Sequence, residues 1–213
     1  MTVLEPDYDS DPGRGRAWVA PRDIHDLVGK ELQGPVLDIG CGEGRLVPTL
    51  VGGVDWVGID SSPRQVAECP YRPIVVGDMR ALPFADDSFA AVVQLWCLYH
   101  VADPRAAIGE ARRVLRGGGR YYACTASTNN DPELMPEGYP PTTFDAEDAV
   151  AIVASVFPNA EPEAWDGAFY PLETRDEIRA YCRSHFIPAE RADAVELPLW
   201  LTKRGVLVRA TKN

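Results

Sequence analysis

A glycine-rich turn directly after a short apolar strand constrains this chain more than any other feature. The stretch "VLDIGCGEGRL", residues 36–46, places glycine at every second position of the turn. Such turns usually receive a phosphate, because bare backbone N–H groups and a helix N-terminus attract anions. Here Asp38 and Glu43 would repel a pyrophosphate, and Arg45 stands where a dinucleotide fingerprint has its third glycine. The turn therefore favours a ligand other than a dinucleotide.

Strand-like and helix-like segments alternate through the first half of the chain. Apolar runs predict strands at residues 35–40, 54–60, 72–78, 89–96 and 117–127. Helical spacing and start signals predict helices at residues 17–32, 43–51, 61–69 and 104–115, with Pro21 in the first turn of the first and Pro48 shortening or kinking the second. This order predicts an α/β fold with a parallel sheet covered on both faces.

The second half is looser but continues the pattern. A Pro- and Asn-rich loop over residues 129–144 is long enough to favour a functional role or mobility. After it we expect a helix at 145–157 capped by Asp145, a strand at 163–172, a helix at 174–186 and a final strand at 204–212. Thr174 and Glu177 have the spacing of a capping box.

The chain shows no domain-separating linker. The prediction is therefore one domain over residues 1–213, made of a cap segment and helix (1–34), a cofactor-binding half (35–127) and a substrate-side half (128–213). The polar segment up to Gly15 is expected to be mobile until something orders it.

Charge and cysteine content narrow the choice of partners. There are 21 Lys and Arg against 32 Asp and Glu, a net charge of −11, which disfavours long contacts with nucleic acid or anionic lipid. No long apolar run suggests a membrane span, and the N-terminal residues lack a signal peptide's apolar core. The five scattered cysteines and three isolated histidines show no metal-ligand spacing. We expect a cytoplasmic protein with reduced thiols, a monomer or homodimer, that acts on small molecules.

Acidic residues end three successive predicted strands. Asp38, Asp60 and Asp78 should converge on one cleft, because ligands of such sheets bind beyond the carboxyl ends of the strands. Asp60 lies 22 residues after Asp38, where a carboxylate accepts hydrogen bonds from ribose hydroxyls. Asp78 could accept from the amine of an adenine, and Met79 could pack on the base. Alternatively, Asp38 only orients the turn, Asp60 caps a helix and Asp78 is a turn residue.

A ribose, an adenine and a cationic tail without phosphate describe S-adenosylmethionine. The acids suit its sulfonium and ammonium, and its carboxylate would rest on the N-terminus of the helix after the turn. The product would be S-adenosylhomocysteine.

Four stretches in this order resemble the motifs of a known family. "VLDIGCGEGRL", "WVGID", "VVGDMRALPFADDSF" and "RRVLRGGGRYY" are similar to those of class I S-adenosylmethionine-dependent methyltransferases, in particular the small type 11-like members, and the likeness covers residues 35–126. The resemblance implies a Rossmann-like, doubly wound sheet of seven strands, mostly parallel with an antiparallel last strand. The family often has an acid where this chain has Ala90.

Carried over by position, the resemblance implies one set of cofactor-binding residues: Asp38, Gly40, Cys41, Gly42, Gly44, Asp60, Ser61, Asp78, Met79, Leu95 and Trp96. Within this set the turn would line the methionine end. Trp96 is equally well explained as a core residue, because its surroundings are apolar.

The predicted activity is in-line methyl transfer to a small-molecule acceptor, with O, N, S or C methylation left open. His100, after the fourth strand, is the candidate general base; it could instead cap the next helix or pack under the following turn. Further candidates for acceptor contact are Tyr99, Tyr122, Tyr139, Asn129 and Asn130. Two alternatives remain: methylation of RNA or protein, and a non-catalytic protein that binds the cofactor or its product.

Overall fold

A computed structural model describes residues 23–185 and 187–213, without the side chains of residues 169 and 170. The predictions for the segment up to Gly15 and for Pro21 lie outside these residues. The elements run in chain order as α1 Ile24–Gly29, β1 Val36–Ile39, η1 Val47–Thr49, β2 Trp56–Asp60, α2 Pro63–Glu68, β3 Ile74–Val76, β4 Phe89–Leu95, η2 Leu98–His100, α3 Pro104–Val114, β5 Leu115–Ala126, α4 Ala146–Ala154, β6 Glu161–Leu172, α5 Arg175–Ser184, η3 Ala189–Asp193 and β7 Leu199–Thr211. Here η marks a short 3-10 helix.

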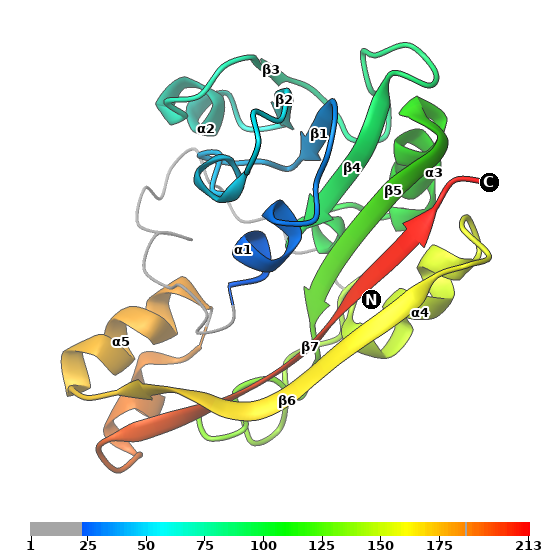
Figure 1. The fold of residues 1–213 in the computed structure, drawn as a ribbon. Helices are drawn as coiled ribbons and strands as arrows, with labels where there is room; N and C mark the ends of the chain where they lie inside the picture. Colours follow the sequence, from blue (N-terminus) through cyan, green and yellow to red (C-terminus); the bar gives the residue numbers. More distant parts are fainter. Residues whose placement is uncertain (1–22, 186) are drawn as a thin grey trace.

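The strands form one seven-stranded sheet in the order β3-β2-β1-β4-β5-β7-β6 (Figure 1). The pairs from β3 to β5 are parallel, whereas β7 runs antiparallel to both β5 and β6. The predicted α/β class, the seven strands and the reversed last strand are therefore confirmed. In this order the chain moves outward from β1 to β3 and then returns to β4 on the other side, which is the reversal that creates a binding crevice.

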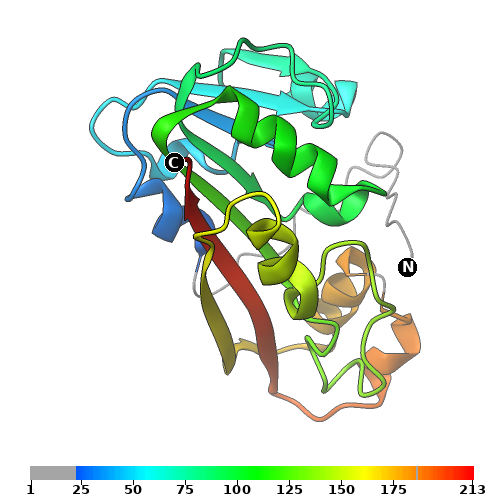
Figure 2. The same ribbon diagram turned by 90° about the vertical axis from the view of Figure 1, so that its right-hand side faces the viewer.

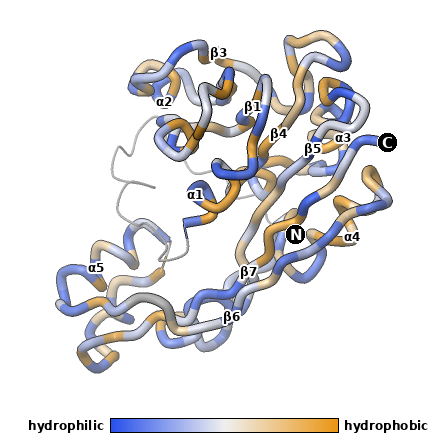
Figure 3. Tube along the Cα trace, in the orientation of Figure 1, coloured by the Kyte–Doolittle hydropathy of each residue, from blue (hydrophilic) through white to orange (hydrophobic). Residues whose placement is uncertain are grey.

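Helices cover both faces of the sheet. One buried cluster joins α3 and α4 to side chains such as Val92 and Tyr121, and a second joins α1 to the opposite face through Val36 and Tyr122. Figure 2 shows α3 and α4 over one face, and Figure 3 shows that apolar residues concentrate in the strands between the layers. Alternate residues of β5 thus serve the two cores, as expected for a strand with two covered faces.

A small lobe extends beyond the carboxyl edge of the parallel strands. The last residue of β5, Ala126, pairs with Gly205, so the first part of β7 pairs only with β6. A third buried cluster fills this lobe, where α5 and the loop before α4 contact the strand pair through Leu134, Ile178 and Leu201. The predicted strand at 163–172, the final strand and the capping box of Thr174 and Glu177 are all confirmed here.

The helix predicted over residues 43–51 is wrong. Only a 3-10 turn, η1, forms there, with Pro48 inside it. Gly44 adopts a φ of +80°, which ends regular structure at the start of the segment, and Pro48 has no N–H to continue a helix at its centre. No long helix dipole therefore follows the glycine turn.

Other boundaries also differ from the prediction. Of the described part of the first predicted helix, residues 23–32, only α1 is helical, and Asp23 caps it by accepting from the N–H of His25. Asp145 stands at the N-cap of α4 without a capping bond, because its carboxylate accepts from the N–H and hydroxyl of Thr142 instead. Ser62 caps α2 by accepting from the N–H of Gln65.

Glu31, just after α1, ties this part of the chain to the sheet. Its carboxylate accepts from Arg209 at 2.7 Å and from Arg120 at 3.0 Å. Burial raises the pKa of Glu31. The hydrogen bond and charge of Arg209 and the charge of Arg120 lower it by more than burial raises it, so the net pKa lies below its ordinary value. The stabilisation is therefore present at neutral pH and is lost as the pH falls through the lowered pKa.

We expect Glu31→Gln to lower the free energy of unfolding by about 1–2 kcal/mol at pH 7, because the charge-assisted hydrogen bonds from Arg209 and Arg120 weaken. Urea unfolding at pH 7 and pH 3 measures the effect, which should shrink at the lower pH. Asp26→Asn on α1 is the control, since its pair with Lys30 is exposed. A Glu31 variant no less stable than this control would contradict the role of Glu31.

Candidate cofactor site

The backbone N–H groups of the glycine turn are already used within the protein. Gly40 and Cys41 donate to the carbonyl of Ile59 at 2.8 and 3.2 Å, and Gly44 donates to the carbonyl of Cys41 at 2.9 Å. Gly42 donates to a carboxylate oxygen of Asp60 at 2.8 Å. A phosphate needs several N–H groups that point at it together. The turn is therefore poorly suited to a pyrophosphate, as predicted, and for a further reason: four of its N–H donors are occupied.

Close packing explains two of the turn glycines. Gly40 has a φ of +68°, and a Cβ there would lie 2.5 Å from Cβ of Cys97 at the end of β4. A Cβ on Gly44 would lie 2.8 Å from the ring of Tyr71 and 3.0 Å from Sγ of Cys69. Gly40 thus brings the turn against β4, whereas Gly44 packs toward the segment after α2.

Asp38 and Asp60 lie on neighbouring strands at the carboxyl edge, as the parallel pairing of β1 and β2 requires. Asp60 holds the turn and α2 together, because its two oxygens accept from the N–H groups of Gly42 and of Ser62 at 2.8 and 2.9 Å. The alternative that Asp60 only caps a helix is incomplete, since one oxygen fixes the glycine turn. Asp38 is 5% exposed and accepts from the indole N–H of Trp56 at 3.2 Å.

Asp38 is the most perturbed carboxyl group of this edge. Its pKa is raised to about 6: burial is the main cause and the charge of Asp60 adds to it, while the charge of His25 and the Trp56 hydrogen bond oppose the rise. A buried carboxylate with one neutral donor is unstable as an anion and gains most from a cation placed beside it. This is the electrostatic preference that a sulfonium or ammonium would satisfy.

Asp78 stands apart from this pair. The strand β3 ends at Val76, and Asp78 follows it with its carboxylate in a bidentate pair with Arg80, at 2.7 Å to the nearer guanidinium nitrogen. The hydrogen bonds of Arg80 lower the pKa of Asp78, whose side chain is 45% exposed. The chain returns to the edge at Gly77, which donates to the carbonyl of Asp60 at 2.9 Å. Two of the three acids are thus brought together, whereas the carboxylate of Asp78 pairs with Arg80.

The other predicted cofactor residues divide into two groups. Met79 lies over the turn, with its methyl carbon 4.0 Å from the position of a Cβ on Gly40. Ser61 is exposed beside Asp60. Cys41 and Leu95 are buried in the core next to α1, and burial raises the pKa of the Cys41 thiol well above its usual range.

Gln65 on α2 was not predicted. Its side-chain atoms lie 4.0 Å from the position of a Cβ on Gly42, and its Oε1 is buried without a hydrogen-bond partner. A buried polar atom of this kind is rare and needs a partner. The sequence offers only a weak signal for such a role: the N–H of Gln65 donates to the hydroxyl of the helix cap Ser62.

The two residues predicted after β4 lie at the same edge. Trp96 has a φ of +59°, which is uncommon for a residue other than glycine, and its ring meets Trp165 of β6. His100 ends η2 and packs against the Tyr99 ring at 4.4 Å. Asp103, rather than His100, caps α3, so the helix-capping alternative for His100 is wrong.

One direct observation indicates that the residues at this edge can bind S-adenosylmethionine. The buried acceptors Asp38 and Gln65 lack strong donors, and hydroxyl or ammonium groups would supply them. The carboxylate of S-adenosylmethionine has no helix N-terminus beside the glycine turn to bind to, because the helix predicted at residues 43–51 is absent. In the part of the chain that the structure describes, no group of three His, Cys, Asp or Glu side chains could hold a metal ion. No helix among the described residues has the length and apolar character needed to span a membrane.

Comparison with known proteins supports the same assignment. Residues 37–123 match the family model described as a methyltransferase domain. A demethylmenaquinone methyltransferase of Beutenbergia cavernae is 38% identical over 121 residues, covering 54% of this chain and 50% of that protein. Another from Mycolicibacterium vanbaalenii is 36% identical over 151 residues, covering 70% of this chain and 65% of that protein. This chain spans 28% to 65% of the length of these and similar curated relatives.

Solved structures share the fold at low identity. The YcgJ protein of Bacillus subtilis superposes with a TM-score of 0.65 at 18% identity, covering 89% of this chain and 97% of that one. The [4+2]-cyclase SpnF superposes with a TM-score of 0.62 at 19% identity, covering 89% and 80%. These likenesses establish the fold alone. The family match over residues 37–123, which include the glycine turn and the strand-end acids, shows that this part of the chain is a methyltransferase domain.

Proposed function

We propose that this chain transfers the methyl group of S-adenosylmethionine to a small-molecule acceptor. The observation that carries the proposal is the pair of strand-end carboxylates, Asp38 buried and Asp60 fixing the turn, around a backbone whose N–H groups are occupied. Such a site attracts a cationic nucleoside, whereas a phosphate would be repelled by the carboxylates and would find few N–H donors. The demethylmenaquinone methyltransferases similar to this chain also support a small-molecule acceptor.

S-adenosylmethionine supplies an electrophilic methyl group: the acceptor forms the new bond to carbon, the S–CH3 bond breaks with its electron pair kept by sulfur, and the acceptor loses a proton. We assign Asp60 to the ribose hydroxyls and Asp38 to the cationic end. Met79, above the turn, is assigned to the adenine. Asp78 could still accept from the adenine amine once its pair with Arg80 opens. The chain's main task is to hold the reactants in line without water, which alone can remove ~7–11 kcal/mol of the barrier.

Transfer of label from methyl-labelled S-adenosylmethionine tests the proposal. The protein is incubated with a small-molecule extract of its source cells and, separately, with total RNA and total protein. Label should appear in the small-molecule fraction. Label only in RNA or protein would favour the macromolecular alternative, and tight binding without any transfer would favour a non-catalytic binding protein.

We further propose His100 as the general base for an acceptor that arrives protonated. His100→Ala should then lower kcat by about 100-fold, at the lower end of what general base catalysis contributes, and leave the Kd of the cofactor unchanged. The rising limb of the pH profile of kcat should also disappear. Full turnover by His100→Ala on the identified acceptor would remove His100 from the mechanism.

A further inference from the structure

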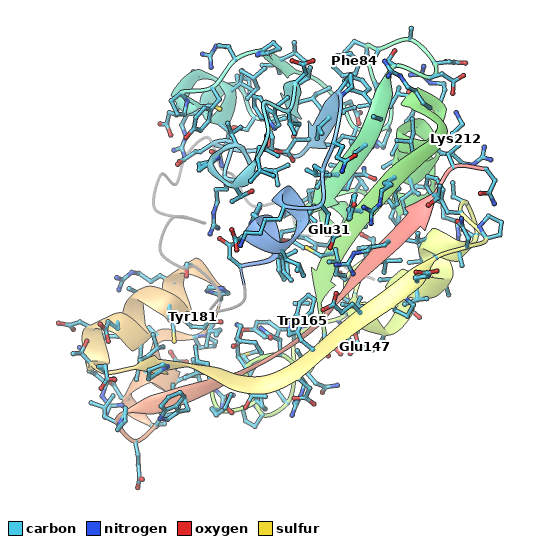
Figure 4. All side chains as sticks on the ribbon, in the orientation of Figure 1. Glu31, Phe84, Glu147, Trp165, Tyr181 and Lys212 are labelled. Atoms are coloured by element: carbon cyan, nitrogen blue, oxygen red, sulfur yellow. The ribbon has the colours of Figure 1, made fainter. Side chains whose placement is uncertain are left out.

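Trp165, at the carboxyl edge of the sheet, belongs to no part of the site described so far. It lies on β6 opposite Gly205 of β7, which in turn pairs with Ala126 of β5. A Cβ on Gly205 would lie 2.3 Å from the indole of Trp165. The absence of a side chain at 205 therefore lets this indole lie across the backbone of β7, toward the ends of β5 and β4. Figure 4 shows Trp165 near the end of β5, below Glu31 in that view.

The indole of Trp165 meets that of Trp96 there. The two ring centroids are 6.0 Å apart and the planes are inclined by 67°, an edge-to-face pair. Trp96 follows β4 and Trp165 comes from the outer strand β6. The contact between the two indoles therefore reaches across the two strands that lie between them, β5 and β7. In an edge-to-face pair the edge of one ring meets the face of the other, and both indoles also pack against the buried cluster next to α1.

Trp96 is held in this place at a conformational cost. A left-handed φ on a bulky residue costs on the order of 1–3 kcal/mol, and such residues cluster at functional sites. Its N–H donates to the carbonyl of Cys124 at 3.2 Å, and the next residue, Cys97, abuts Gly40 of the cofactor turn. Trp96 therefore stands between the cofactor turn and Trp165.

The two indoles also differ in burial from other aromatic side chains of the sheet. Tyr121 and Tyr122 are 0% exposed, whereas Trp96 and Trp165 are only partly buried. Their position on the β4 to β6 side separates them from Asp38, Asp60 and Gln65, which lie on the β1 and β2 side. A nucleoside held by the acids would thus leave the tryptophans for the second reactant.

We propose that Trp96 and Trp165 form an aromatic surface that binds the methyl acceptor, and that the acceptor is a planar aromatic small molecule. This inference rests on the proposed function. A cationic acceptor is the less favoured occupant, because neighbouring acids already have cationic partners: Asp166 pairs with Arg204 at 3.0 Å and Asp131 with Lys203 at 2.6 Å.

The test uses 1-naphthol as a planar probe and decahydro-1-naphthol as its saturated counterpart, titrated calorimetrically into the full chain saturated with S-adenosylhomocysteine. We expect saturable binding of 1-naphthol that is at least 10-fold tighter than that of the saturated alcohol. Trp165→Met should weaken 1-naphthol binding at least 10-fold, whereas Trp165→Phe should weaken it less than 3-fold. Trp200→Leu, on an exposed residue of β7, is the matched control and should change nothing.

Three results would overturn the inference: no saturable binding of 1-naphthol, equal binding of both alcohols, or unchanged binding by a folded Trp165→Met protein. Thermal unfolding and the affinity for S-adenosylhomocysteine check that the variant is folded, and if it is not, the comparison of the two alcohols on the unmodified chain decides. If S-adenosylhomocysteine does not bind, the proposed function fails instead. Titration of 1-naphthol into the protein alone then shows separately whether the aromatic surface exists.

Discussion

Asp60→Asn is expected to weaken S-adenosylmethionine binding by about 100-fold. The substitution removes the charge that accepts from the N–H groups of Gly42 and Ser62, and it replaces one acceptor oxygen by a donor. A charge-assisted hydrogen bond contributes about 1.5–3 kcal/mol, and the ribose hydroxyls would lose at least one of them together with the order of the turn. Isothermal calorimetry at pH 7.5 measures the change in Kd.

Asp55→Asn is the matched control for this prediction. Asp55 is exposed and directly precedes β2, at the end of that strand opposite to Asp60. It should leave the Kd unchanged while lowering the negative charge by the same amount. If Asp60→Asn behaves like this control, the assignment of the ribose to Asp60 is wrong.

Asp38→Asn should have opposite effects on stability and on binding. The folded pKa of Asp38, about 6, lies above its ordinary value of 3.8, so the folded state binds its proton more tightly than the unfolded state does. The associated stability is present below the unfolded pKa and is lost as the pH rises through the folded pKa. At pH 7 this loss of stability amounts to about 3 kcal/mol, by conversion of the difference between the folded pKa and the ordinary value.

An asparagine in place of Asp38 would avoid this cost because it stays neutral, and its carbonyl oxygen can still accept from the Trp56 indole. We therefore expect Asp38→Asn to raise the free energy of unfolding at pH 8, with little change at pH 3, and to weaken S-adenosylmethionine binding at least 10-fold. Urea unfolding at both pH values and calorimetry at pH 7.5 measure the two effects. A less stable variant at pH 8 would contradict the view that Asp38 is kept at the expense of stability for a cationic ligand.

Much of the sheet could be predicted from the sequence because its signals are local. Apolar runs such as those of β1 and β4 have few alternatives to a buried strand, and the alternation with helices predicts parallel pairing. The neighbouring positions of Asp38 and Asp60 then follow from the parallel register of β1 and β2. The helix predicted after the glycine turn does not form, because Gly44 has a left-handed φ and Pro48 lacks the N–H that a longer helix needs.

The rest of the site depends on contacts that no local pattern encodes. The pair of Asp78 with Arg80 reflects how the chain turns after β3, and Trp165 reaches Trp96 only because β6 pairs with β7 in a register that sets it opposite Gly205. Gln65 becomes part of the candidate cofactor site only because the fold places its side chain beside Gly42. Such long-range placements are fixed by sheet order and register, which the sequence specifies through the whole core.

A competition between a cationic nucleoside and a phosphorylated one tests the electrostatic account most directly. Calorimetric titration of the unmodified protein with S-adenosylmethionine and with NAD at pH 7.5 gives both dissociation constants in one buffer. The buried carboxylate and the occupied N–H groups of the turn predict saturable binding of S-adenosylmethionine and at least 100-fold weaker binding of NAD. Equal or tighter binding of NAD would contradict the account.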